Sequence, residues 1–114
     1  MEHPPSFDDG RPEFDLAFAQ SLIGKYVLVG VTVEDRRGQL KRHEQFHGTV
    51  ISADAHAGIK LVLCGEREGE TKWLPPATHV FDSAQKGTYT LRATGERVID
   101  PDFTAQWVLV QPDA

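Results

Sequence analysis

Residues 26–34 show the clearest alternation of hydrophobic and polar positions in the chain. β-Branched residues favour strands, and every second residue of this segment is a valine. Because successive side chains of a strand point to opposite faces, one face would be apolar and would turn toward a core. That face would consist of Val27, Val29, Val31 and Val33, with Leu28 and Thr32 on the other face.

Shorter apolar segments separated by turn residues follow this strand. Residues 35–38 (Asp-Arg-Arg-Gly) predict a turn, after which the chain would return as a second strand. Gly48 interrupts that returning strand, which indicates a bulge or a sharp bend of the kind that closes small barrels. Pro75 and Pro76 would end a later strand, because proline cannot donate to a sheet ladder. The strands predicted after the first one are residues 39–53, 59–64, 71–75, 89–93 and 103–111.

Helical periodicity is confined to residues 14–23. Phe14, Phe18 and Leu22 would line one face of a short helix together with Ile23 and Leu16. Gly24 is placed to stop it. Such a short helix is marginal alone in water, so we expect it to dock on the strands and to plug one end of a barrel.

Five or six short strands with one short N-terminal helix predict a mainly β fold. We expect a small five- or six-stranded antiparallel barrel, either Src-homology-3-like or OB-like. Residues 1–12 are acidic and rich in proline and predict a flexible tail. The remaining residues, 13–114, predict a single barrel domain, since 114 residues leave little room for a second one.

Composition and charge narrow the function classes. The net charge of −5 argues against nonspecific nucleic-acid binding, which depends on phosphate neutralisation. No apolar run is long enough to cross a membrane, and the acidic start is unlike a signal peptide, so we expect a cytoplasmic protein. One local exception to the acidic balance is a predicted basic hairpin formed by Arg36, Arg37, Lys41 and Arg42, with Phe46 nearby.

His43, Glu44 and His47 match the H-E-x-x-H signature of zinc hydrolases, in which the glutamate is the general base. That chemistry needs a helix, which brings residues four apart onto one face. In a strand they lie roughly 13 Å apart, too far to share a metal. Leu40 and Phe46 make no apolar stripe, and the segment continues into β-branched residues. We therefore expect a strand here and predict neither a metal site nor a cofactor.

Other candidate chemistry is sparse. Cys64 would be a nucleophile if His47 or His79 activated it, but we interpret it as a small buried residue near a strand end. The aromatic residues Tyr26, Phe46, Trp73, Tyr89 and Trp107 fall on different strands and would either fill the core or share a stacking surface. No motif establishes an enzyme.

Three segments carry a family resemblance: FHGTVISAD at residues 46–54, WLPP at 73–76 and YTLRATGERVIDPDF at 89–103. Together with the strand around Trp107, they resemble a group of small uncharacterised bacterial proteins, over residues 22–110. The resemblance implies a bacterial origin and a compact β domain. It implies no activity and no site residues.

Three functions follow as hypotheses. The first is a non-enzymatic binding module of the adaptor or inhibitor type that acts on a protein partner. The second is a nucleic-acid-binding barrel that uses Arg36, Arg37, Lys41 and Arg42 with Phe46. The third and weakest is a minimal zinc hydrolase built on His43, Glu44 and His47. The oligomeric state stays open.

Overall fold

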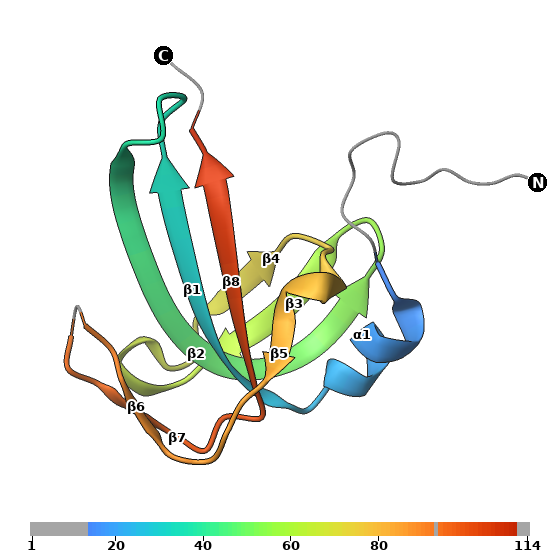
Figure 1. Cartoon of the computed structure of the whole chain (residues 1–114). Helices are drawn as coiled ribbons and strands as arrows, with labels where there is room; N and C mark the ends of the chain where they lie inside the picture. The colour runs from blue at the N-terminus through green and yellow to red at the C-terminus, as the bar shows by residue number, and fades with distance from the viewer. Residues whose placement is uncertain (1–13, 93, 112–114) are drawn as a thin grey trace, which may run out of the picture.

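Three long strands form the centre of the structure, and the valine-rich strand lies in the middle of them (Figure 1). The computed structural model describes residues 14–92 and 94–111. β1 (Tyr26–Glu34) pairs antiparallel with β2 (Leu40–Asp54) and parallel with β8 (Phe103–Val110). As predicted, the four alternating valines of β1 are buried and face the core.

A six-stranded mixed sheet contains these strands in the order β4-β3-β2-β1-β8-β5. Its shorter members are β3 (Gly58–Leu63), β4 (Thr71–Leu74) and β5 (Phe81–Ser83). β6 (Thr88–Thr90) and β7 (Arg97–Ile99) form a separate two-stranded sheet. Two single 3₁₀ turns, η2 (Gly65–Arg67) and η3 (Thr78–Val80), lie in the connections.

The predicted antiparallel barrel is wrong in two respects. The β1–β8 pair is parallel, and the described part of the sheet is open, with β4 and β5 at its two ends. The parallel pair arises because β8 is reached through a long connection, residues 35–102, whereas neighbouring strands joined by short turns pair antiparallel. The sheet curves instead of closing, and one apolar cluster lies between its two halves.

The curvature runs along β2, a single strand of 15 residues (Figure 1). Gly48, predicted to be a bulge or a sharp bend, is no bulge, since it keeps its regular partners Val27 and Leu63. The irregular registers lie elsewhere, between Val33 and Glu34 and between Val50 and Ser52. Glycine is required at position 48 for another reason. A Cβ atom there would lie 2.3 Å from the carbonyl oxygen of Val62, so only glycine lets β3 approach.

The predicted N-terminal helix is confirmed as α1 (Leu16–Leu22), somewhat shorter than residues 14–23. The Asp15 carboxylate caps it by accepting from the Phe18 N–H at 3.0 Å. Leu22 is fully buried in the core, and the Phe18 ring meets Phe103 edge to face, so the helix docks on the sheet. Leu16 and Ile23, expected on the packed face, are exposed. The predicted flexible tail, residues 1–12, lies outside the described residues.

None of the helices in the described part of the chain is long and apolar enough to cross a membrane.

Candidate interaction surface

The ends of β1, β2 and β8 project from the body of the molecule as a three-stranded arm (Figure 1). β3 pairs with β2 only from Gly48 to Asp54, and β5 pairs with β8 only from Phe103 to Ala105. Beyond these pairings the sheet is three strands wide. We define the arm as residues 30–45 and 106–110.

One side of β8 is open along the arm. No described strand pairs with Gln106–Val110 on the side away from β1, and we call this segment the open edge. The Gln111 N–H donates to the Glu34 carbonyl, so odd-numbered residues of β8 direct their backbone groups toward β1. Because these groups alternate along a strand, Gln106, Val108 and Val110 direct their N–H and C=O groups outward.

The open edge is apolar. Val108, Leu109 and Val110 are 62%, 43% and 61% exposed, and residues 103–111 contain no charge, proline or glycine. Edge strands are normally protected against pairing by such residues. The opposite edge of the arm follows that rule, because β2 carries Lys41 and Arg42 there. The β8 edge is therefore the side of the arm that can accept a further strand.

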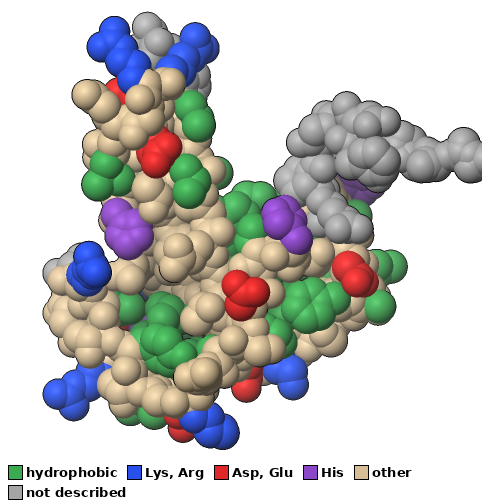
Figure 2. Space-filling view, in the orientation of Figure 1, with side chains coloured by type: hydrophobic (Ala, Val, Ile, Leu, Met, Phe, Trp, Pro, Cys, Tyr) green, Lys and Arg blue, Asp and Glu red, His purple; other side chains and the backbone are tan. Residues whose placement is uncertain are grey.

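Lys and Arg side chains gather at the tip of the arm (Figure 2), where Arg36 and Arg37 lie in the turn and Lys41 and Arg42 follow at the start of β2. The Asp35 carboxylate shapes this turn by accepting from the N–H groups of Arg37 and Gln39, both at 2.9 Å. Phe46 does not join them. It is 2% exposed in the core opposite Val29, with the Arg67 guanidinium near its ring. The tip thus offers positive charge without a stacking aromatic ring.

The remaining aromatic residues do not form one surface. Trp107 is buried and meets Phe81 edge to face, with its indole Nε1 the one buried side-chain polar atom in the described residues that has no hydrogen-bond partner. Trp73 is 49% exposed on β4, with the Lys60 ammonium over its ring. Tyr89 is half-buried on β6.

The H-E-x-x-H segment lies in β2, as expected for a strand. His43 pairs with Thr32 and His47 with Leu28, so the two imidazoles occupy positions four residues apart along one face. That separation is about 13 Å. Glu44 lies on the opposite face, 3.5 Å from the Lys72 ammonium. No group of three His, Cys, Asp or Glu side chains in the described residues could hold a metal ion.

His47 instead belongs to a buried polar cluster that the sequence did not predict. Its Nδ1 lies 2.6 Å from the Tyr26 hydroxyl and its Nε2 lies 2.7 Å from Glu96 Oε2. The Glu66 N–H also donates to that carboxylate oxygen. Glu96 is 49 residues from His47 in sequence, between β6 and β7, so no local spacing could have revealed the contact. The cluster ties the β6–β7 hairpin to β1 and β2.

A neutral imidazole accommodates both of the hydrogen bonds that His47 makes. Nε2–H of His47 donates to the Glu96 carboxylate, and the Tyr26 hydroxyl donates to Nδ1. Burial raises the pKa of Tyr26 above its usual value of 10.0, and the negative charges that Cys64 and Glu96 can carry raise it further. The phenol therefore remains a donor at neutral pH, which suits a structural cluster better than a nucleophile.

Neither of the two candidate bases, His47 and His79, is placed to activate Cys64. Its backbone N–H donates to the His47 carbonyl at 2.9 Å, but both ring nitrogens of His47 are engaged by Tyr26 and Glu96. The imidazole therefore has no acceptor to offer the thiol. The other candidate base, His79, is exposed in η3. The thiol is partly buried, consistent with a small packing residue.

A groove of about 370 Å³ lies beside the base of the arm, on the face of the sheet opposite the apolar cluster. Tyr89, Thr90 and Leu91 form one wall, and the floor comes from β1, β2 and β8. The Gln45 side chain lies in this floor and holds the hairpin by accepting from the Arg92 N–H at 3.0 Å. Apart from His43, the lining residues are uncharged: Leu28, Val29, Gly30, Gln45, Tyr89, Thr90, Leu91, Thr104, Ala105 and Gln106.

Comparison of the chain with protein-family models, curated proteins and solved structures found no match. The resemblance to small bacterial β proteins therefore stays a prediction.

Proposed function

We propose that this protein is a non-enzymatic binding module that acts on a protein partner through the open edge of β8. The observation that carries the proposal is the uncharged strand end at Gln106–Val110 on a projecting arm, which no described strand pairs with on the side away from β1. Exposed edges of this kind pair with extended segments of other chains. Backbone hydrogen bonds would supply much of the affinity, and the side chains that flank the edge would select the partner.

The side chains at the edge divide between two faces. Gln106, Val108 and Val110 belong to the face that carries the groove, whereas Trp107 and Leu109 lie opposite Val31 and Val33 on the core face. A partner strand would meet an apolar contact on each face. An extended segment with β-branched or aromatic residues is therefore the partner chemistry that fits best.

The buried polar cluster supports binding over catalysis. The Tyr26 hydroxyl, both ring nitrogens of His47 and one Glu96 carboxylate oxygen already have partners within the protein, so the cluster holds the hairpin in place. A catalytic site would instead need groups that can exchange protons with a substrate.

Nucleic-acid binding is the second candidate, and the four cations at the tip favour it. Phosphate contacts alone would make such binding weak and strongly dependent on salt. Reversing the charges of Arg36 and Arg37 should remove any binding of single-stranded oligonucleotides at low salt. If the unmodified protein binds none under those conditions, this candidate is excluded.

The proposal is tested by affinity capture with the full chain as bait. Val108→Pro removes an N–H that points outward, so the β1–β8 ladder is kept while the edge loses a donor. The matched control is Ile99→Pro in β7. Ile99 is 61% exposed, and since Asp100 N–H donates to Gly87 O, the N–H of Ile99 also points away from its partner strand.

We expect a captured protein that the unmodified chain and Ile99→Pro retain and that Val108→Pro loses. Circular dichroism establishes that both variants are folded. A captured protein that binds Val108→Pro as well as it binds the unmodified chain would contradict the proposal, as would a chain that captures no protein and does not associate with itself.

A further inference from the structure

We propose that the strand that pairs with the open edge is β8 of a second copy of this chain, arranged antiparallel about a two-fold axis at Val108. The proposal rests on the proposed function, since it names the partner of the same edge. The β8 segment is itself extended, apolar and without charge, which is the partner chemistry that the edge requires.

The backbone of the open edge is complementary to itself in this register. Outward-facing N–H and C=O groups belong to Gln106, Val108 and Val110. An axis at Val108 sets Val108 against its own copy and Gln106 against Val110 of the other copy. All three resulting pairs join outward-facing residues, and each such pair exchanges two hydrogen bonds. No outward-facing group of the open edge is then left unpaired.

The length of the free segment selects the same register. On the N-terminal side of the open edge, Ala105 already pairs with Phe81 of β5, so a strand from a second copy cannot pair there. Five residues remain, about 17 Å of strand. An axis at Trp107 would set Val110 against Thr104 of the other copy, which β5 already occupies. The axis at Val108 uses all of the free segment and does not displace β5.

The side chains also match. Val108 would meet its own copy on one face, and Trp107 would meet Leu109 of the other copy on the core face. Aromatic and branched aliphatic side chains make favourable cross-strand pairs. Pairing would cover Val108 and Val110, which are among the most exposed hydrophobic residues of the described chain.

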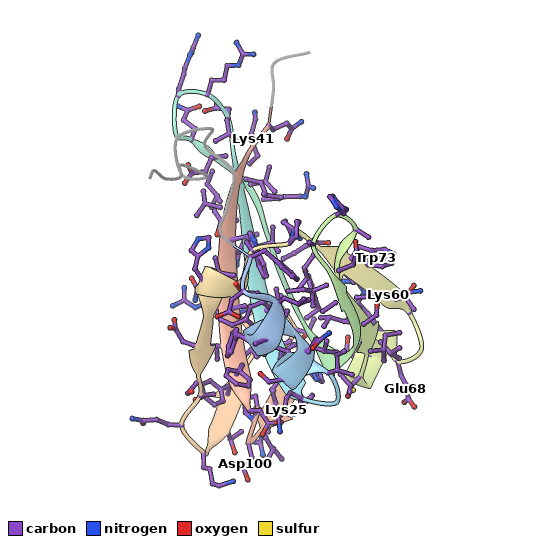
Figure 3. All side chains as sticks on the ribbon, turned by 90° about the vertical axis from the view of Figure 1, so that its right-hand side faces the viewer. Lys25, Lys41, Lys60, Glu68, Trp73 and Asp100 are labelled. Carbon is purple, nitrogen blue, oxygen red and sulfur yellow. The ribbon has the colours of Figure 1, made fainter. Side chains whose placement is uncertain are left out.

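The charges at the tip favour the antiparallel arrangement over a parallel one. Viewed at right angles to Figure 1, the arm rises as a single layer near Lys41 (Figure 3). Two arms joined in parallel would bring the cations of both tips to the same end. In the antiparallel pair the two tips lie at opposite ends, so like charges stay apart. The uncharged edge adds no opposed charges of its own.

The primary test is the solution mass of the full-length protein as a function of concentration, measured by sedimentation equilibrium. A single short strand pair is a small interface, so we expect dissociation in the range of about 1–100 μM. The mass should rise from 12.7 kDa toward twice that value across this range. Val108→Pro should raise the dissociation constant at least about tenfold, while Ile99→Pro should leave it unchanged.

Cross-linking tests the register. In a Cys64→Ser background, Val108→Cys should form a disulfide-linked dimer on mild oxidation, because opposed residues of a hydrogen-bonded antiparallel pair are about 5.5 Å apart between Cα atoms. Ile99→Cys, of equal exposure, is the control and should remain monomeric. Amide hydrogen exchange gives a second measure. Exchange at Val108 and Val110 should slow as concentration rises, and exchange at Leu109, which faces β1, should change less.

A mass of one chain at every concentration would overturn the second-copy proposal, and so would a dimer that Val108→Pro leaves intact. The two proposals remain distinguishable. A monomer whose edge still captures a different protein, lost in Val108→Pro, rejects the second copy and keeps the binding function. A monomer without any edge-dependent partner rejects both.

Discussion

At the scale of single residues, the two histidines of the H-E-x-x-H segment have different environments. His47 is 4% exposed and bonds to both Tyr26 and Glu96, whereas His43 is exposed beside the groove. In the zinc-binding motif both histidines would be equivalent metal ligands. In the strand, His47 lies in a buried hydrogen-bond network and His43 is in contact with solvent. Their substitution should therefore have unequal effects.

We expect His47→Ala to lower the free energy of unfolding by about 2 kcal/mol, because it leaves two partly buried partners, Tyr26 and Glu96, without their hydrogen bonds to the imidazole. His43→Ala should change it by less than about 0.5 kcal/mol. Urea denaturation followed by fluorescence measures both values. Equal losses in the two variants would show that the buried cluster does not contribute in this way.

The raised pKa of Tyr26 predicts a loss of stability at alkaline pH. In the folded protein, burial keeps the Tyr26 phenol protonated at pH values at which the phenol of the unfolded chain, with a pKa near 10.0, is already ionised. The stabilising contribution is therefore complete below pH 10 and is lost as pH rises through the folded pKa. In a Tyr89→Phe background Tyr26 is the only tyrosine of the chain.

Phenolate absorbance of the Tyr89→Phe variant should show a titration midpoint above 10 when the protein is folded and near 10 in denaturant. A titration midpoint of Tyr26 at or below pH 10 in the folded protein would show that burial does not raise its pKa. Tyr26→Phe should remove this part of the alkaline loss of stability.

At the scale of elements, β2 determines the shape of the molecule. Its curved path carries β3 and β4 to the far side of the core, and its N-terminal half forms one edge of the arm. Gly48 was correctly identified from the sequence as a special position, but the bulge predicted there is absent. The requirement for glycine comes from the neighbouring strand, since the Val62 carbonyl and Leu63 Cα occupy the space of a side chain.

Gly48→Ala should therefore destabilise the protein by about 1–3 kcal/mol through backbone displacement. Gly30→Ala is the matched control within β1, because the nearest atom to its new Cβ would be 3.7 Å away. We expect the control to remain within about 0.5 kcal/mol of the unmodified protein. Thermal and urea unfolding of both variants measure the difference, and similar losses would contradict the close-approach argument.

At the scale of the whole molecule, the central sheet joins distant parts of the chain. β1 receives β8 as a parallel neighbour, and β8 also supports β5 and supplies Ala105 and Trp107 to the core. A chain ending at Asp102 would lose these contacts and leave one side of β1 open. We expect it to be largely unfolded.

Far-ultraviolet circular dichroism and one-dimensional proton spectra of such a truncated chain provide the measurement. Cooperative unfolding and dispersed amide signals in the truncated chain would show that β8 is an accessory strand. Removal of only residues 112–114 is the control and should leave the spectra unchanged.

The local pattern of hydrophobic, polar and turn-forming residues was sufficient to predict several elements of the fold. The alternating valines of β1, the stop of α1 near Gly24 and the end of β4 before Pro75 were all predicted correctly. These features depend on nearest neighbours along the chain, on side-chain periodicity and on backbone restrictions of glycine and proline. The turn at residues 35–38 was also predicted correctly, because it too depends on neighbouring residues.

The sequence by itself determined where the longer strands and the turn after β1 form and which face of β1 is apolar, since those properties are local. It did not predict the short strands β5 and β7. Only the tertiary structure decided how the strands are ordered. Among the described strands, parallel pairing of β1 with β8 leaves a curved open sheet and an arm whose edge at Gln106–Val110 has no partner strand. It also decided that His47 meets Tyr26 and Glu96 and that Phe46 is buried away from the tip. Each of these contacts joins segments that are distant in sequence. Such pairings cannot be predicted from the local pattern of hydrophobic and polar residues.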